Sequence, residues 1–234
     1  MISPGKPETV AQMFDRVAER YDLLNSVLSL GTHWLWKKKL VNRGAKGLAG
    51  ASKILDCATG TGDIAELWSK KLGPSAQIIA TDFSAGMLDC ARKRHSGSAI
   101  RFDWADVQKL SFEDGSFDRA SISFGIRNVQ DPLAALKELG RVVCPGGQVL
   151  ILEFGQPSYP VFSSFYRFYS EKILPQIGGI ISGQKSAYRY LSDSSARFPC
   201  GERFLEIVRQ AGKFKSMRAE SLTGGIAWLY ILNV

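Results

Sequence analysis

The stretch from Lys53 to Asp63, K-I-L-D-C-A-T-G-T-G-D, constrains the fold of this chain more than any other. Its apolar start is typical of a short buried strand, and Gly60 and Gly62 then form a turn. A helix is predicted to begin at Asp63, with that side chain as its cap. Because glycines allow backbone N–H groups to approach a ligand closely, this order of strand, turn and helix predicts a binding site for a small molecule.

Two classes of ligand fit this turn. The run G-T-G-D-I-A from Gly60 matches the dinucleotide pattern G-x-G-x-x-G/A, and Asp82 lies where an acid binds a ribose. However, Asp56 and Asp63 flank the turn and would repel a pyrophosphate. S-adenosylmethionine has no phosphate, and acidic side chains favour its ammonium and sulfonium groups. The residues therefore favour S-adenosylmethionine over a dinucleotide, and a glycine turn without a ligand is the third alternative.

Strands and helices are predicted to alternate through the middle of the chain. The predicted strands are 53–57, 77–81, 100–104, 118–123 and 148–153, and the predicted helices between them lie near 64–72, 85–94 and 133–143. This alternation predicts an α/β fold with a mostly parallel sheet covered on both faces. Asp56, Asp82, Asp106 and Ser123 fall at or just past predicted strand ends, where such sheets bind ligands.

We predict a single domain over residues 1–234, because no linker, repeat or low-complexity segment divides the chain. It comprises an N-terminal helical arm (1–50), a cofactor-binding core (51–155) and a C-terminal helix with two strands (201–234). Within the arm, helices are predicted over about 8–30 and 33–48. Residues 156–200 interrupt the alternation and contain aromatic residues at helical spacing. We interpret this insertion as a lid over the site, with ordinary core packing as the alternative.

The composition is that of an ordinary soluble protein of 234 residues, with a net charge of +8. No stretch approaches the roughly 18 apolar residues of a membrane span. The first ten residues lack an apolar secretory segment, so we expect a cytoplasmic protein. Four cysteines form no C-x-x-C pair, and no metal site is predicted. The positive charge suits nucleic acid, an anionic membrane surface or solubility alone.

Several longer motifs resemble those of one enzyme family. The motif Y-D-x-x-N-x-x-x-S-x-G, from Tyr21 to Gly31, and the motif S-F-G-I-R-N-V, from Ser123 to Val129, resemble the two signatures of the UbiE/MenG quinone C-methyltransferases. Further family-like segments are P-G-G at 145–147, L-E-F at 152–154 and Y-R-Y-L at 188–191. The resemblance covers nearly the whole chain. It implies a class I methyltransferase fold (Rossmann-like), with a seven-stranded sheet whose last strand is antiparallel.

The resemblance also implies that S-adenosylmethionine is the cofactor and that a polyprenylated quinol is methylated on a ring carbon. The matching cofactor-binding positions are Thr61, Asp82, Asp106, Val107 and Ser123, and Asp56, Gly60 and Gly62 complete the loop. One branch of the family converts demethylmenaquinol to menaquinol. The other methylates 2-methoxy-6-polyprenyl-1,4-benzoquinol in ubiquinone synthesis. The residues do not separate the branches, and we favour demethylmenaquinol because the family's default member in menaquinone-using bacteria makes that step.

The reaction requires a nucleophilic ring carbon. A quinol ring becomes nucleophilic when a hydroxyl loses its proton, so the protein must align the ring, stabilise the aryloxide and accept a proton. Arg127 is our candidate for aligning the ring and stabilising the aryloxide, directly or through a water, and a structural ion pair with a carboxylate is the alternative. Asn128 is expected either to position a quinol oxygen or to cap the next turn. Glu153 is a candidate proton acceptor.

Three functions are compatible with the sequence: a quinol C-methyltransferase, an RNA methyltransferase, and a non-catalytic cofactor-binding scaffold. The segment Ser123–Gly125 differs from the N/D-P-P-Y/F loop typical of base methylation, and the basic residues are scattered, so we expect no nucleic-acid partner. Trp34 and Trp36 beside the lysines 37–39 suit either peripheral membrane contact or a solvated face. The oligomeric state stays open, and a homodimer is compatible with the sequence.

Overall fold

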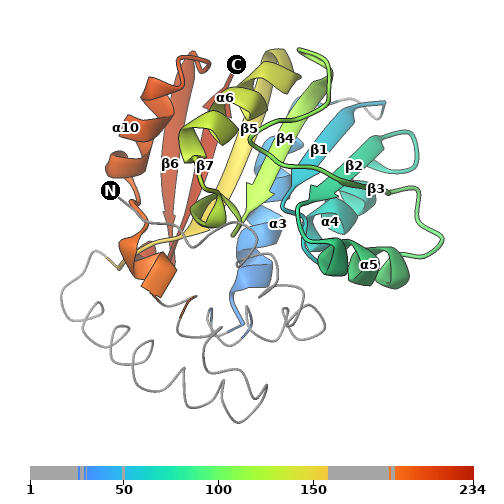
Figure 1. Cartoon of the computed structure of the whole chain (residues 1–234), viewed down its shortest axis with the longest axis horizontal. Coiled ribbons are helices and arrows are strands. Elements are labelled where there is room, and N and C mark those ends of the chain that lie inside the picture. The colour runs from blue at the N-terminus through green and yellow to red at the C-terminus, as the bar shows by residue number, and fades with distance from the viewer. Residues whose placement is uncertain (1–25, 27–28, 30, 49–50, 158–189, 191–192) are drawn as a thin grey trace.

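The computed structural model describes residues 26, 29, 31–48, 51–157, 190 and 193–234. These residues form a seven-stranded sheet. Helices lie against both faces of this sheet (Figure 1). The predicted α/β fold with a mostly parallel sheet is confirmed.

The strand order predicts a ligand-binding site at the carboxyl ends of the central strands. The strands are β1 (Lys53–Cys57), β2 (Gln77–Asp82), β3 (Arg101–Trp104), β4 (Phe117–Ser123), β5 (Val143–Phe154), β6 (Ser216–Leu222) and β7 (Ala227–Asn233). They lie in the order β3-β2-β1-β4-β5-β7-β6. The strands from β3 to β5 in this order pair in parallel, and β7 runs antiparallel to β5 and β6. The antiparallel last strand is therefore confirmed. The chain reverses its direction across the sheet between β1 and β4, which is where open α/β sheets bind ligands.

Two apolar layers hold the helices onto the sheet. The helices are α3 (His33–Gly44), α4 (Asp63–Leu72), α5 (Ala85–Arg94), α6 (Pro132–Val142) and α10 (Glu202–Gln210), with short 3₁₀ turns η2 (Ile126–Asn128) and η4 (Thr223–Gly225). One layer joins α3 and α4 to the sheet around the fully buried Trp68. The other joins α6 and α10 to the opposite face through Leu139 and Phe204. Helix α5 packs against β2 and β3.

Two elements differ in length from their predicted bounds. The helix predicted over 33–48 ends at Gly44, and Gly47 follows with a left-handed φ of +75°, which a right-handed helix does not contain. The strand predicted from Gln148 begins at Val143, which pairs with Phe117 before the register shifts. The P-G-G segment therefore lies in an irregular stretch of β5 and does not precede the strand.

Helix α3 carries the aromatic and basic residues considered for membrane contact or a solvated face, and two of them, Trp36 and Lys37, lie in the interior instead. Trp36 and Lys37 are both only 4% exposed. The Trp36 indole N–H donates to the Thr223 hydroxyl at 2.9 Å, and Lys37 pairs with Asp63. These side chains therefore connect α3 to the rest of the fold, whereas Leu35 on the same helix is 66% exposed.

Other predictions fall on residues that the structure does not describe. They are the helix over 8–30, most of the N-terminal family motif and most of the lid over 156–200. These stay predictions, as does the division of the chain into an arm, core, lid and C-terminal part. Among the described helices, none combines the length and the hydropathy needed to cross a membrane.

Candidate functional site

The carboxyl ends of β1, β2, β3 and β4, with the turns that follow them, enclose a pocket. Five of the ten predicted site residues line it: Gly60, Asp82, Asp106, Val107 and Asn128. The other five are Asp56, Thr61, Gly62, Ser123 and Arg127, which do not belong to the pocket wall. Half of the predicted site residues thus line one pocket, and the other half lie outside its wall.

Asp82 ends β2 and connects the glycine turn to the next helix. One carboxylate oxygen accepts the Gly60 N–H at 2.8 Å, and the other accepts the Ser84 N–H at 2.9 Å. Ser84 in turn caps α5, because its hydroxyl accepts the Met87 N–H. A carboxylate has about four acceptor positions, so the same side chain can also receive ligand hydroxyls.

Asp106 and Gln108 form the wall of the pocket after β3. The Gln108 side-chain amide donates to both Asp106 oxygens, at 3.0 and 3.2 Å, and its backbone N–H donates to the nearer one at 2.9 Å. The Gln108 side-chain oxygen accepts the backbone N–H of Asp131, the residue that caps α6. Gln108 thereby ties the two connections on either side of β4 together. Only its position two residues after Asp106 hinted at this role in the sequence.

Asp56 lies inside β1 and is 1% exposed. One of its oxygens accepts the Thr59 hydroxyl and the other accepts the Ser121 hydroxyl, both at 2.7 Å. The Trp68 indole N–H donates to Ser121 at 3.1 Å, which extends this buried chain to α4. Burial raises the pKa of Asp56 from 3.8 to about 7, against the lowering effect of the two hydroxyls.

The sequence argument placed the carboxylates of Asp56 and Asp63 beside the ligand, and this placement was wrong because neither residue lines the pocket. Asp63 is 3% exposed and pairs with Lys37 at 2.6 Å and with Arg94 at 3.0 Å. Two cations therefore compensate its charge, and Asp56 is bonded inside the sheet. Asp63 also does not cap α4: Gly62 is the N-cap, with a φ of +88°. The acids that line the pocket are Asp82 and Asp106.

Two strained turns meet at the floor of the pocket. Ala58 after β1 has a φ of +49°, and Phe124 after β4 has a φ of +55°, although neither is glycine. A Cβ at Gly125 would lie 2.5 Å from the Ala58 Cβ, so the turns touch where only glycine fits. All three residues line the pocket. Such strained backbone persists where surrounding contacts hold it, often at functional sites.

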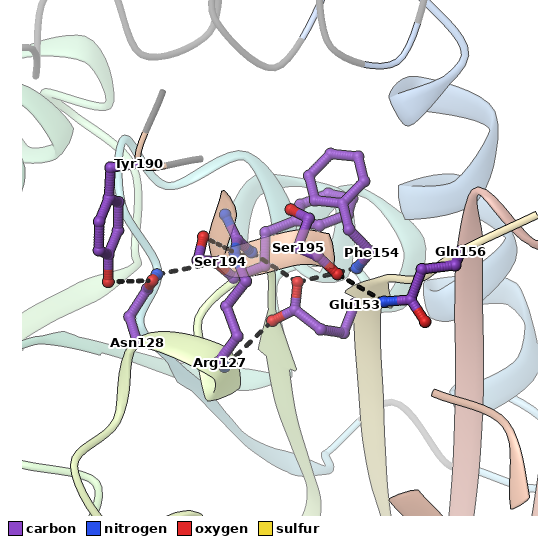
Figure 2. A network of polar contacts seen from close by, with 9 residues as sticks. Arg127, Asn128, Glu153, Phe154, Gln156, Tyr190, Ser194 and Ser195 are labelled. Carbon is purple, nitrogen blue, oxygen red and sulfur yellow. Dashed lines mark hydrogen bonds and ion pairs between the residues drawn. The ribbon is translucent and has the colours of Figure 1, made fainter. Parts of the chain in front are cut away.

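Arg127 and Glu153 form a buried ion pair beside the pocket (Figure 2). The side chains are 0% and 1% exposed, and Arg127 Nη1 lies 2.5 Å from Glu153 Oε1. The same nitrogen donates to the Phe124 carbonyl at 2.7 Å, and Nε donates to the Ser194 hydroxyl at 3.4 Å. Burial raises the pKa of Glu153, while the guanidinium opposes this shift. The structural ion pair that the sequence left as the alternative for Arg127 is thus present.

Asn128 extends from η2 into the pocket, with its amide fixed from two sides. Its amide nitrogen donates to the Phe124 carbonyl at 3.4 Å, and its oxygen accepts the Tyr190 hydroxyl at 3.1 Å (Figure 2). Burial raises the pKa of Tyr190, so this hydroxyl stays protonated and able to donate. The motif that contains Asn128 was visible in the sequence, but its contact with Tyr190, 62 positions away, was not.

The remaining pocket residues were not predicted as site residues. They include Phe83 and Met87, which give the wall near Asp82 an apolar surface. Phe83 directly follows Asp82, which was the available signal. Ser123 ends β4, and among the described residues its buried hydroxyl has no hydrogen-bond partner. Ser123 therefore closes the strand without forming part of the pocket wall.

The side chains that line the pocket fit S-adenosylmethionine. Apolar side chains suit its flat base, and the two carboxylates suit its hydroxyls and positive groups. No lysine, arginine or histidine of the described chain lines the pocket, although a pyrophosphate would favour one. This absence of basic side chains favours S-adenosylmethionine over a dinucleotide.

Sequence comparison with known proteins also indicates a methyltransferase. The sequence pattern of the ubiE/COQ5 methyltransferase family matches residues 3–232. The chain is 52% identical over 226 residues to the ubiquinone/menaquinone biosynthesis C-methyltransferase UbiE of Bdellovibrio bacteriovorus, with 96% of this chain and 95% of the relative covered. It is 42% identical over 221 residues to the demethylmenaquinone methyltransferase of Thermus thermophilus, with 94% and 98% covered.

Solved structures agree on the fold. A possible histamine N-methyltransferase of Thermotoga maritima, which is S-adenosylmethionine-dependent, has a TM-score of 0.65 over 95% of this chain and 98% of that chain, at 20% identity. A phosphoethanolamine N-methyltransferase of Haemonchus contortus with bound S-adenosylhomocysteine has a TM-score of 0.64 over 86% and 52%, at 18% identity. The fold is therefore that of the class I methyltransferases. Since the family pattern and the relatives span almost the whole sequence, this chain belongs to the ubiE/COQ5 methyltransferase family and is an enzyme that takes its methyl group from S-adenosylmethionine.

Proposed function

We propose that this enzyme methylates a ring carbon of a polyprenylated quinol, with demethylmenaquinol as its main substrate. The observation that supports this most is the position of Asn128, which brings a polar group of the second family motif into the same pocket as Asp82 and Asp106. The choice of demethylmenaquinol is supported by relatives that carry that name in Thermus thermophilus and in Staphylococcus aureus, the latter 37% identical over 225 residues.

Cofactor binding is assigned to the predicted residues that line the pocket. S-adenosylmethionine supplies a methyl group on a positively charged sulfur. Asp82 would receive the ribose hydroxyls, and Gly60, Asp106 and Val107 would form the remaining contacts of the predicted set. Asp56, Thr61, Gly62 and Ser123 would then support the walls of the pocket from behind.

Asn128 is the catalytic residue in this proposal. Its amide nitrogen carries two N–H groups, one of which points to the Phe124 carbonyl. The other can donate to a quinol oxygen, and a hydrogen bond to the deprotonated form lowers the pKa of that hydroxyl. The Phe124 carbonyl fixes the orientation of the amide, because a carbonyl oxygen only accepts and therefore requires the Asn128 nitrogen, and the Asn128 oxygen then accepts the Tyr190 hydroxyl.

Arg127 is a positioning residue in this proposal. Its guanidinium is saturated on one side by Glu153 and by the Phe124 carbonyl, the same carbonyl that Asn128 contacts. It therefore holds the strained turn on which Asn128 is mounted. Glu153 is committed to this ion pair, which speaks against its use as the proton acceptor.

Quinone analysis in a bacterium without its own C-methyltransferase tests the substrate. Cells that express this chain are expected to convert accumulated demethylmenaquinone to menaquinone. The Asn128→Ala variant should lose this conversion while it binds S-adenosylmethionine within about threefold of wild type, and Asn233→Ala on β7 is the matched control. Unchanged conversion by Asn128→Ala would contradict the role of Asn128.

The benzoquinol is the second candidate substrate. The Bdellovibrio relative is named for both ubiquinone and menaquinone biosynthesis. Methylation of only the ubiquinone precursor in the same cells would reject demethylmenaquinol and keep the reaction. No methylation of either quinone by a chain that binds the cofactor would favour a non-catalytic scaffold.

We also propose a cytoplasmic enzyme that touches the membrane peripherally, because a polyprenylated quinol resides in lipid. Among the described residues, Leu35 and Lys38 on α3 are exposed and suit this contact. Co-sedimentation with vesicles that contain anionic lipid should fall in the double variant Leu35→Asp/Lys38→Ala and not in Lys93→Ala on α5. Equal sedimentation of wild type and both variants would contradict membrane contact through Leu35 and Lys38.

A further inference from the structure

A cluster of charged and aromatic side chains lies behind the glycine turn, opposite its pocket side. It comprises Lys37 of α3, Asp63 of α4, and Arg94 and His95 at the end of α5. None of the four lines the pocket, whereas Ala58 and Gly60 of the same turn do. The turn is therefore held between the pocket on one side and this cluster on the other.

His95 bonds to the backbone of the turn. Its Nε2 lies 3.0 Å from the Thr61 carbonyl oxygen. Because a carbonyl oxygen only accepts, Nε2 must carry the proton. The imidazole is 9% exposed and stacks on Phe102 of β3, with ring centroids 5.9 Å apart and an interplanar angle of 18°. The edge strand thus fixes the orientation in which His95 donates.

His95 also explains why the turn requires glycine at position 62. A Cβ on Gly62 would lie 2.8 Å from both Cδ2 and Nε2 of the imidazole. Gly62 has a φ of +88°, so a side chain would be strained there even without the contact. The imidazole therefore packs directly onto the glycine backbone.

The charged members hold the next residue. The Asp63 carboxylate lies between Lys37 Nζ, at 2.6 Å, and Arg94 Nη1, at 3.0 Å. Arg94 Nη1 also donates to the Thr61 hydroxyl at 3.3 Å. Lys37 and Asp63 have side chains only 5% and 4% exposed, so water screens this pair weakly. Three consecutive residues, Thr61 to Asp63, are thus fixed from outside the pocket.

We propose that His95, supported by Arg94, Asp63 and Lys37, is a positioning residue that sets the affinity for S-adenosylmethionine. It holds the glycine turn in its binding shape before the cofactor arrives, so that binding does not have to order the turn. Thr61 and Gly62, which the sequence assigned to direct contact, contribute through this cluster. The inference concerns the cofactor alone and does not depend on which quinol is methylated.

Two substitutions at His95 separate the hydrogen bond from the bulk of the side chain. His95→Leu keeps an apolar group against Phe102 and loses the donor, whereas His95→Gln keeps an N–H donor. We expect His95→Leu to weaken the binding of S-adenosylmethionine by roughly tenfold, the upper range for a single net hydrogen bond, and His95→Gln to stay within about threefold. Calorimetric titration of the purified protein without quinol gives both values.

Further measurements distinguish positioning from general destabilisation. In steady-state assays with the accepted quinol, KM for S-adenosylmethionine should rise in His95→Leu while KM for the quinol stays within twofold. Hydrogen exchange at residues 60–63 should be faster in this variant than in wild type, without a change in the core strands. Equal cofactor affinity in His95→Leu and wild type, or equal losses in His95→Leu and His95→Gln, would overturn the proposal.

Arg94 provides an independent test in case His95→Leu does not fold. Arg94→Met should weaken cofactor binding about threefold or more, because it removes the contacts with Thr61 and Asp63. Lys93→Met is the matched control on the same helix, because Lys93 lies between Arg92 and Arg94 in sequence and is exposed. Equal cofactor affinities for these two variants would contradict the role of the cluster.

Discussion

At the scale of single residues, the buried carboxylate of Asp56 has a measurable consequence for stability. Because its pKa in the folded protein is about 7 and its ordinary value is 3.8, the unfolded chain releases this proton at lower pH than the folded protein. The contribution of Asp56 to stability is therefore complete below about pH 4 and is lost as the pH rises towards 7.

The Asp56→Asn variant tests this shift. Between about pH 4 and pH 7, the unfolding free energy of wild type should fall by up to roughly 4 kcal/mol. The variant should not show this fall, because an asparagine cannot ionise. Urea unfolding at pH 4 and pH 8 measures the difference. Asp114→Asn is the control, because the Asp114 side chain is 81% exposed. A parallel pH dependence in wild type and Asp56→Asn would contradict a raised pKa.

A second prediction at this scale concerns the buried ion pair of Arg127 and Glu153. Glu153→Gln leaves the guanidinium buried without an opposite charge, which typically costs about 3–5 kcal/mol. Glu138→Gln breaks a pair with Arg141 whose side chains are 21% and 23% exposed, and this should cost about 1 kcal/mol or less. Denaturant unfolding of both variants at one pH compares them. Similar losses would show that burial does not govern the energy of the Arg127 pair.

At the scale of elements, the turns after β1 and β4 depend on each other. Gly125→Ala would place a methyl group 2.5 Å from the Ala58 Cβ, so we expect a loss of about 1–3 kcal/mol in unfolding free energy and weaker cofactor binding. The double variant Ala58→Gly/Gly125→Ala removes that contact and should recover most of both losses. Additive effects of the two substitutions would contradict direct contact between the turns.

The sequence predicted the elements better than their contacts. Apolar periodicity and glycine turns placed the strands and helices of the core, because these patterns are local. The P-G-G segment misled the prediction of β5, since its irregular pairing depends on Phe117 in another strand. In the same way, residues at strand ends were predicted to gather at one site, and five of the ten predicted site residues line one pocket. The partners of Asp63, Arg127 and Asn128 lie 26 to 62 positions away in sequence and became visible only in the fold.

At the scale of the whole molecule, the candidate site lies at the carboxyl ends of the strands, and the apolar packing that stabilises the fold lies on the two faces of the sheet. The layers of α3 with α4 and of α6 with α10 bury the strands from the two faces (Figure 1). The turns at the carboxyl ends of the strands line the pocket. The cofactor turn is held from behind by α3 and α5, and Asn128 is held by the Arg127 turn. The two halves of the pocket therefore have separate supports, which their variants should reveal as separate losses of cofactor binding and turnover.

The most direct test is methyl transfer by the purified enzyme from S-adenosylmethionine with a deuterated methyl group. Demethylmenaquinone and the demethylated ubiquinone precursor are offered separately in detergent, each in reduced and oxidised form, and mass spectrometry locates the label. We predict one labelled methyl group on a ring carbon of reduced demethylmenaquinone and none when the ring is left oxidised. Label on an oxygen, equal transfer to the oxidised ring, or no transfer by enzyme that binds the cofactor would contradict quinol C-methylation.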